Sequence, residues 1–130
     1  MRPGATMVAT ASSAEPQFSA TADCAQGTLV VSLVGTVEFS NKGKVDEFLR
    51  KVHAAARDRE AREVIVDFRG LEFMNSSCLK AFVAWIDTIL ALPAAEQYRV
   101  VFVSSREIAW QKRSLLALSC LAVGLVSIEA

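Results

Sequence analysis

The stretch from residue 64 to residue 80, VIVDFRGLEFMNSSCLK, restricts the fold more than any other part of the chain. It opens with a β-branched apolar run that is broken only by Asp67 near its end. After a short link, Asn75, Ser76 and Ser77 stand at the beginning of a long amphipathic segment. A continuous apolar run is typical of a strand covered by helices, and small polar residues before an amphipathic segment are typical of a helix N-terminus. The stretch therefore predicts a buried strand, a loop, and a helix whose first turn carries two hydroxyl groups.

Strand and helix patterns alternate along the rest of the chain. Residues 18–24 and 28–37 predict a hairpin with its turn at Gln26-Gly27, and further strands are expected at residues 99–104 and 126–128. Three amphipathic helices are predicted. The first is capped by Ser40 or Asn41, and its apolar stripe consists of Val45, Phe48, Leu49, Val52 and Ala56. The second is stopped by Pro93, and its stripe consists of Leu79, Phe82, Val83, Ile86 and Leu90; the third spans residues 108–121, and its apolar residues do not all fit one face. The order β-β-α-β-α-β-α-β predicts an α/β fold with an open, mixed, mostly parallel sheet of 4–5 strands and about three helices.

Length and composition indicate a single domain. The chain has 130 residues, of which residues 1–16 are small and polar and predict a disordered tail, leaving residues 17–130 for the domain. The tail has no apolar segment of the kind that a signal peptide carries. The mean hydropathy of +0.33 is high, but no apolar run approaches the roughly 18–20 residues that a membrane span needs. The apolar excess is therefore assigned to a sheet buried on at least one face.

Charge and cysteine content narrow the classes of function. Lys plus Arg and Asp plus Glu number 14 each, so the chain lacks the basic surplus that favours nucleic acid. Three widely spaced cysteines and a single histidine favour neither a disulfide framework nor a zinc site, and they fit a reducing cytoplasm. The chain has no Walker A loop and no GxGxxG pattern, so neither a cofactor nor enzyme chemistry is predicted.

Ser76 and Ser77 admit two interpretations. Either they cap the helix, which contributes on the order of 1 kcal/mol, or one of them carries a phosphate at a helix N-terminus, where the macrodipole favours an anion. Lys80, about one turn further on, is either a contact for such a phosphate or a solvated lysine. Cys78 is similarly either a redox-active thiol with a lowered pKa or a small semi-buried residue.

Other chemistry-bearing residues give weaker signals. Asp67 at a strand end resembles the phosphoacceptor of a response-regulator receiver, but Glu38 alone is a poor substitute for the acidic pair of that fold, and Ser104-Ser105 stands where a lysine is required. His53 is interpreted as a surface residue. The tryptophans, Trp85 and Trp110, are either core anchors or partner contacts.

Two segments around the central loop carry a family resemblance. DFRG at residues 67–70, followed by FMNSS at residues 73–77 and by Leu79, resembles the signature of STAS domains, and more narrowly that of the bacterial anti-sigma-factor antagonists. Their pattern is a strand ending D-L-S-G, followed by F-[ML]-D-S-[ST]-G-L. GTVE at residues 35–38 is similar to the family's G-x-[LI]-D, which closes a strand before the first helix. The resemblance covers residues 28 to the C-terminus, and the order of elements agrees with it.

The resemblance implies a regulatory switch and no enzyme. In that family the unphosphorylated domain binds an anti-sigma factor that is also a serine kinase of the histidine-kinase-like ATPase type, and this binding frees the sigma factor. The kinase phosphorylates the second hydroxyl residue of the pattern, which is Ser77 by position with Ser76 as the alternative, and a metal-dependent serine phosphatase reverses the reaction. The resemblance, with the rule that ligands meet the carboxyl ends of strands, implies a partner face made of Glu38, Ser40, Asn41, Lys42, Asn75, Ser76, Cys78 and Lys80. Neither nucleic acid nor membrane insertion is expected.

This sequence departs from the family pattern at two positions. Asn75 stands where the family has Asp, which removes a charge beside the acceptor, and Cys78 stands where the family has Gly, which adds a side chain. These departures favour a second hypothesis, in which the chain is a STAS-like binding or scaffold subunit, in signalling or associated with a transporter, that is never phosphorylated. A third hypothesis is a redox-sensitive or enzymatic domain built on Cys78.

Overall fold

The computed structural model describes residues 6–15 and 17–130. The strands are β1 (Thr6–Ala14), β2 (Gln17–Ala25), β3 (Thr28–Val37), β4 (Glu63–Met74), β5 (Arg99–Val103) and β6 (Val126–Glu129). The α-helices are α1 (Lys42–Asp58), α2 (Ser76–Leu90) and α3 (Ala109–Leu121), and short 3-10 helices span Phe39–Asn41 and Ala94–Glu96. In the described part of the chain, no helix combines the length and the apolar composition that crossing a bilayer requires.

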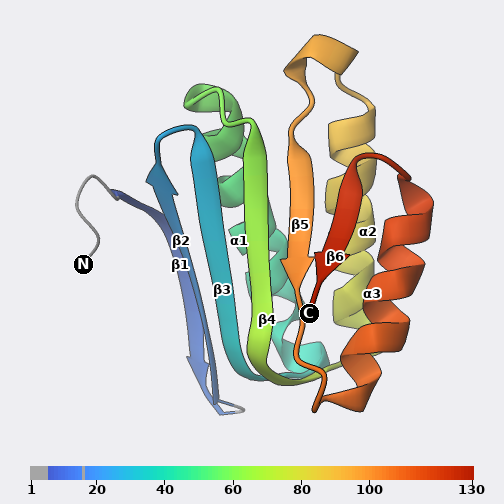
Figure 1. The fold of residues 1–130 in the computed structure, drawn as a ribbon. Coiled ribbons are helices and arrows are strands. Elements are labelled where there is room, and N and C mark those ends of the chain that lie inside the picture. The colour runs from blue at the N-terminus through green and yellow to red at the C-terminus, as the bar shows by residue number, and fades with distance from the viewer. Residues whose placement is uncertain (1–5, 16) are drawn as a thin grey trace.

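The six strands form one mixed sheet in which they lie in chain order. β1, β2 and β3 pair antiparallel, and the three pairings from β3 to β6 are parallel. The three α-helices lie together on one face of the sheet, and the other face is open (Figure 1). The predicted α/β class and the mixed, mostly parallel sheet are confirmed, with six strands in place of 4–5.

The helix-facing side of the sheet and the inner sides of the helices form the core. Alternate residues of β3 and β4, such as Leu29, Val31, Val64 and Val66, are fully buried beneath the helices, as period-2 alternation requires. The apolar stripe predicted for the first helix is confirmed, since all five of its residues are buried on α1.

The N-terminal strand β1 corrects the prediction of a disordered tail over residues 1–16. Residues 6–14 pair with β2 along their length, with Ala11 opposite Ala20, and Ala9 is buried in the core. The prediction failed there because Ala, Ser and Thr side chains produce little hydropathy alternation, whereas backbone pairing stabilises a strand whatever its side chains. Residues 1–5 and 16 lie outside the described residues.

The second and third helices depart in part from the predicted stripes. On α2, Ile89 is buried and Leu90 is exposed, and Trp85 is a core residue. The buried side of α2 is wider than one stripe because the helix packs against both α1 and α3. On α3, Leu115 and Leu118 are buried while several other apolar residues face outward, which agrees with the prediction that they do not share one face.

His53 was interpreted as a surface residue, and the structure shows it half-buried, in a polar network with the buried side chains of Trp85 and Tyr98. Trp85 Nε1 donates a hydrogen bond to the Tyr98 hydroxyl oxygen at 2.8 Å, and the same hydroxyl lies 2.7 Å from His53 Nδ1. The Tyr98 oxygen accepts from Trp85, and the direction of its bond with His53 Nδ1 follows the tautomer of the imidazole. Burial of this group, with Arg57 nearby, lowers the pKa of His53, and burial raises the pKa of Tyr98.

This network predicts a loss of stability below neutral pH. The pKa of His53 is lower in the folded chain than its ordinary value of about 6.5, so the unfolded chain binds more protons between the two pKa values. The free energy of unfolding should therefore be at its full value above about pH 6.5 and should decrease as the pH falls toward the lower, folded pKa. Urea unfolding at pH 7.5 and 5.5 measures the decrease, and the variant His53→Gln should show a smaller one. An identical decrease in the wild type and in His53→Gln would show that titratable groups other than His53 cause the loss of stability.

Candidate functional site

Two loops meet at the carboxyl ends of β3 and β4. The parallel pairing of these strands ends at Val37 opposite Met74. Beyond it, the backbone N–H of Asn75 donates to the Val37 carbonyl at 2.8 Å, and the Cys78 thiol donates to the Glu38 carbonyl at 3.3 Å. The structure therefore brings the loop after β3 directly beside the start of α2, as the strand order predicts.

Asn75 is the N-cap of α2. Its backbone is extended, and its Oδ1 accepts a hydrogen bond from the Ser77 backbone N–H at 2.8 Å. Ser76 is exposed and Ser77 is half-buried, and among the described residues neither hydroxyl takes part in a hydrogen bond. The capping role that was considered for the two serines is therefore filled by Asn75, and both hydroxyls remain at the positive end of the helix.

The other predicted partner-face residues divide into exposed and buried groups. Glu38, Ser40 and Lys80 are exposed, and Lys42 is half-buried with its Nζ 2.9 Å from the Asp46 carboxylate. Asn41 and Cys78 are buried, so their side chains do not form part of the exposed face that was predicted to contact a partner.

The two buried residues hold the loop after β3 in place. Asn41 Oδ1 accepts a hydrogen bond from the Glu38 backbone N–H at 2.9 Å, and Cys78 directs its sulfur inward to the Glu38 carbonyl. Burial raises the pKa of the Cys78 thiol, which is the opposite of what a redox-active thiol requires. The redox hypothesis loses its physical basis.

Two exposed phenylalanines flank this site and were not predicted. Phe39 is 62 % exposed and Phe73 is 44 % exposed, whereas the other five phenylalanines of the chain are buried: Phe18, Phe48, Phe68, Phe82 and Phe102. Phe73 pairs opposite Thr36 at the end of β3, and Phe39 lies in the 3-10 helix just beyond that strand. Exposed aromatic side chains are frequent anchors at protein interfaces. Phe39 and Phe73 differ from the core phenylalanines only in their exposure, which no pattern in the sequence indicates.

The first turn of α3 supports the strand that leads into the site. β4 pairs with β5 only up to Asp67 opposite Val103, and beyond that point β5 no longer provides backbone partners. Gln111, which is fully buried, supplies them: its Nε2 donates to the Phe68 carbonyl at 2.6 Å and to the Leu71 carbonyl at 2.8 Å. Trp110 Nε1 adds a hydrogen bond to the Glu72 carbonyl at 2.7 Å.

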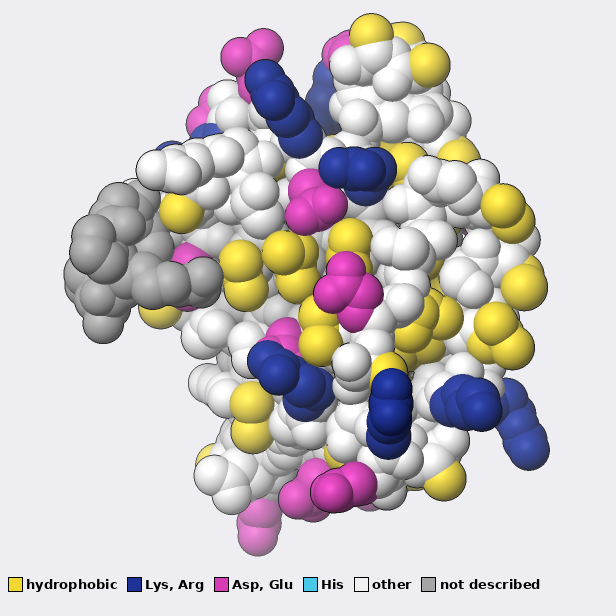
Figure 2. All heavy atoms as spheres, viewed as in Figure 1, with side chains coloured by type: hydrophobic (Ala, Val, Ile, Leu, Met, Phe, Trp, Pro, Cys, Tyr) yellow, Lys and Arg dark blue, Asp and Glu magenta, His cyan; other side chains and the backbone are white. Residues whose placement is uncertain are grey.

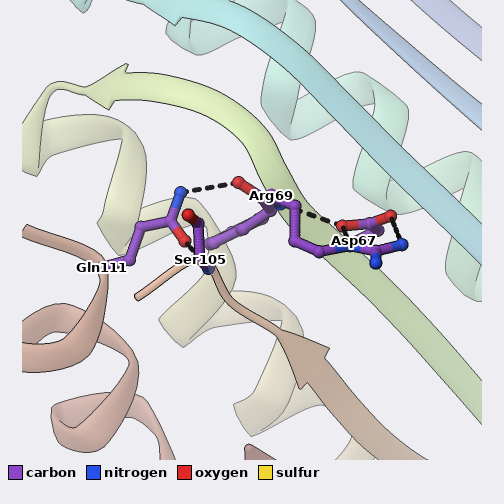
Figure 3. Close-up of polar contacts among 5 residues, drawn as sticks. Asp67, Arg69, Ser105 and Gln111 are labelled. Carbon is purple, nitrogen blue, oxygen red and sulfur yellow. Dashed lines mark hydrogen bonds and ion pairs between the residues drawn. The ribbon is translucent and has the colours of Figure 1, made fainter. Parts of the chain in front are cut away.

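Gln111 also fixes the loop after β5. Its Oε1 accepts a hydrogen bond from the Ser105 backbone N–H at 2.8 Å, so one side chain ties together β4, α3 and this loop (Figure 3). A glutamine in an amphipathic helix usually faces water, and the sequence contains no signal for this role.

Asp67 lies outside the site at the loops. Its carboxylate pairs with Arg69 at 2.9 Å, and these hydrogen bonds lower its pKa (Figure 3). This local pairing occupies the carboxylate that a receiver-type phosphoacceptor would need. Within residues 6–15 and 17–130, no three His, Cys, Asp or Glu side chains come together where they could hold a metal ion.

Comparisons with known proteins agree with this architecture. The family model of the STAS domain matches residues 19–107, which is more than half of the chain. Among solved structures, the fold is similar to the crystal structure of an anti-sigma factor antagonist from Mycobacterium paratuberculosis, with a TM-score of 0.63, 16 % sequence identity, and coverage of 90 % of this chain and 89 % of that chain. At this identity the likeness shows a shared fold. A search of curated proteins gives no match.

Proposed function

The chain belongs to the STAS domain family, and we propose from this that it is a regulatory switch like the anti-sigma-factor antagonists. In this proposal it binds an anti-sigma factor that is also a serine kinase of the histidine-kinase-like ATPase type. Phosphorylation of Ser77, with Ser76 as the alternative, releases the partner, and a metal-dependent serine phosphatase restores binding. The domain itself is not an enzyme, and it acts in the cytoplasm on transcription through its partner. The observation that carries the proposal is the pair of uncommitted hydroxyls at the N-terminus of α2.

The site suits a charge switch that leaves the fold intact. A phosphate adds about −1.5 to −2 charges at neutral pH, and the N-terminus of a helix tolerates them because of its macrodipole. Asn75 would continue to cap α2 through the Ser77 backbone N–H, which the modification does not use. The same phosphate would place a hydrated charge at the end of the sheet where Phe39 and Phe73 are exposed, at the ends of β3 and β4. An apolar contact with a partner is then penalised by desolvation.

The two departures from the family pattern have different consequences in the structure. Cys78 points inward, so replacing the family's glycine adds no bulk to the exposed face. Asn75 caps the helix as an aspartate would, but without a negative charge beside the acceptor. Asn75 is therefore the remaining feature that favours the second function, a STAS-like binding or scaffold subunit that is never phosphorylated.

Substitutions at Ser77 test the switch. Ser77→Ala should retain the fold and the partner and should block modification. Ser77→Asp should raise the Kd for the partner at least about tenfold, because a charge is introduced into a contact that excludes water. Each variant serves as bait for affinity purification from the organism's own cells, and mass spectrometry identifies a retained histidine-kinase-like ATPase. Titration of that protein against each variant then gives the Kd values.

Ser127→Asp provides the matched control. Ser127 is exposed on β6, away from the two loops, so the same substitution there should leave the Kd unchanged. Equal partner binding by the wild type, Ser77→Asp and the corresponding Ser76→Asp would contradict a charge switch. That outcome would favour the non-phosphorylated binding subunit.

A further inference from the structure

The helix α3 carries apolar side chains on two sides. Its inner side is buried against the domain through Leu115 and Leu118. Its outer stripe, defined here as Leu116, Ala117, Cys120 and Leu121 together with Val123 just beyond the end of the helix, is exposed, with Leu116 57 %, Leu121 46 % and Val123 90 % accessible. In Figure 2 hydrophobic side chains gather along the right-hand side of the molecule, where Figure 1 shows α3. A contiguous group of exposed apolar side chains commonly marks an interaction surface, and the isolated chain leaves this side of α3 uncovered.

An apolar groove continues the outer stripe toward β6. It has a volume of about 740 Å³, and its apolar lining comes from Ile108 and Ala109 at the start of α3, from Leu116, and from Ile128 of β6. The lining also includes polar side chains: Ser104, Ser105, Arg106 and Lys112. The groove therefore extends the exposed apolar surface of α3, through Leu116, to Ile128 of β6.

The charges of α3 are distributed against its own macrodipole. Lys112 and Arg113 lie in its N-terminal half, its first turn has no acidic residue, and its last turn has no basic residue. Within residues 6–15 and 17–130, neither Lys112 nor Arg113 forms an ion pair. Cations stabilise the C-terminal end of a helix, so these two side chains suit the C-terminus of another helix that runs in the opposite direction.

We propose that the outer stripe of α3 is a homodimer interface, in which two copies of α3 pack antiparallel across a two-fold axis. Antiparallel packing sets Leu116 of each copy against Leu121 of the other, and it brings Lys112 and Arg113 to the electronegative end of the other α3. The small side chains Ala117 and Cys120 lie next to the axis, where they let the helices approach closely. A parallel arrangement would instead bring the basic residues of the two copies together. One patch that contacts itself forms a closed dimer, since a two-fold interface is isologous.

The oligomeric state of the purified chain tests the dimer. Sedimentation velocity over about 1–100 μM, a range that covers micromolar dissociation constants, should show a monomer–dimer equilibrium. Leu116→Lys should raise the dimer Kd at least about tenfold, as expected when an apolar anchor is replaced by a charge. Leu90→Lys, which introduces the same charge at an exposed leucine of α2, should leave it unchanged. Both residues are exposed in the monomer, so circular dichroism should show both variants folded.

A charge variant and a cross-link test the antiparallel arrangement. Arg113→Glu should weaken the dimer, whereas Arg50→Glu on the exposed side of α1 should not. A short bis-maleimide should join two chains through Cys120, the exposed cysteine, because Cys24 and Cys78 are buried, and Cys120→Ser should abolish the product. A chain that stays monomeric over the whole range, or a dimer that Leu116→Lys and Leu90→Lys weaken equally, would overturn the proposal.

Discussion

The variant Gly35→Ala is expected to lower the free energy of unfolding by about 3 kcal/mol, since it combines backbone strain with a steric collision. Gly35 has a φ of +103°, which L-residues with a side chain rarely adopt. An added Cβ would also collide with the carbonyl oxygen of Gln17 and lie 3.0 Å from Phe18 Cα, both on the backbone of the neighbouring strand β2. Backbone atoms cannot rotate away as a flexible side chain can, so β2 and β3 would have to separate locally.

Gly43→Ala is the matched control for this prediction. Gly43 lies on α1, and a Cβ added there meets no atom within 4 Å. The same methyl group should therefore raise the free energy of unfolding by up to about 1 kcal/mol, since alanine favours a helix over glycine. Urea unfolding of both variants measures the difference. Similar effects of the two substitutions would contradict the backbone conformation described for Gly35.

The variant Gln111→Leu is expected to lower the free energy of unfolding by a similar amount, about 3 kcal/mol. The substitution keeps the volume of the side chain but leaves the Phe68 and Leu71 carbonyls and the Ser105 N–H without their partner. Each buried polar group that loses its hydrogen bond costs roughly 1–3 kcal/mol, although neighbouring costs do not add fully. Because these carbonyls belong to the end of β4, hydrogen exchange should also become faster in the loop that leads to Ser77.

Gln97→Leu is the control for Gln111→Leu. Gln97 Nε2 also donates to two carbonyls, those of Leu90 and Leu92, but it lies in a more exposed loop. Water can replace it there, so the loss in the free energy of unfolding should stay below about 1 kcal/mol. Equal losses for the two glutamines would show that Gln111 does not support β4 as described.

The elements with strong periodicity could be predicted from the sequence. The five buried residues of α1 recur at helical spacing among charged residues, so burial and pattern coincide. β1 escaped prediction because its small side chains carry little hydropathy signal and its position depends on pairing with β2. On α2 the predicted stripe ended at Leu90 where the structure buries Ile89, because contacts with two neighbouring helices determine which residue faces the core.

The adjacency of the two loops could be predicted from the sequence, but the directions of their side chains could not. The order of strands places the loops after β3 and β4 together, and Asn75 follows a helix-start pattern. The inward direction of Asn41 and Cys78 depends on hydrogen bonds to the Glu38 backbone, which no local pattern encodes. The role of Gln111 likewise depends on where β5 ends relative to β4, a relation between distant segments.

Phosphosite mapping by mass spectrometry, on the protein isolated from growing and from stressed cells of its own organism, tests the proposed switch most directly. The proposal predicts phosphate on Ser77, or on Ser76, in a fraction that changes with condition. Replacement of the chromosomal copy by Ser77→Ala should remove the Ser77 phosphopeptide while the protein remains folded and abundant. A chain that carries no phosphate on either serine in any condition would contradict the switch and leave a constitutive STAS binding module.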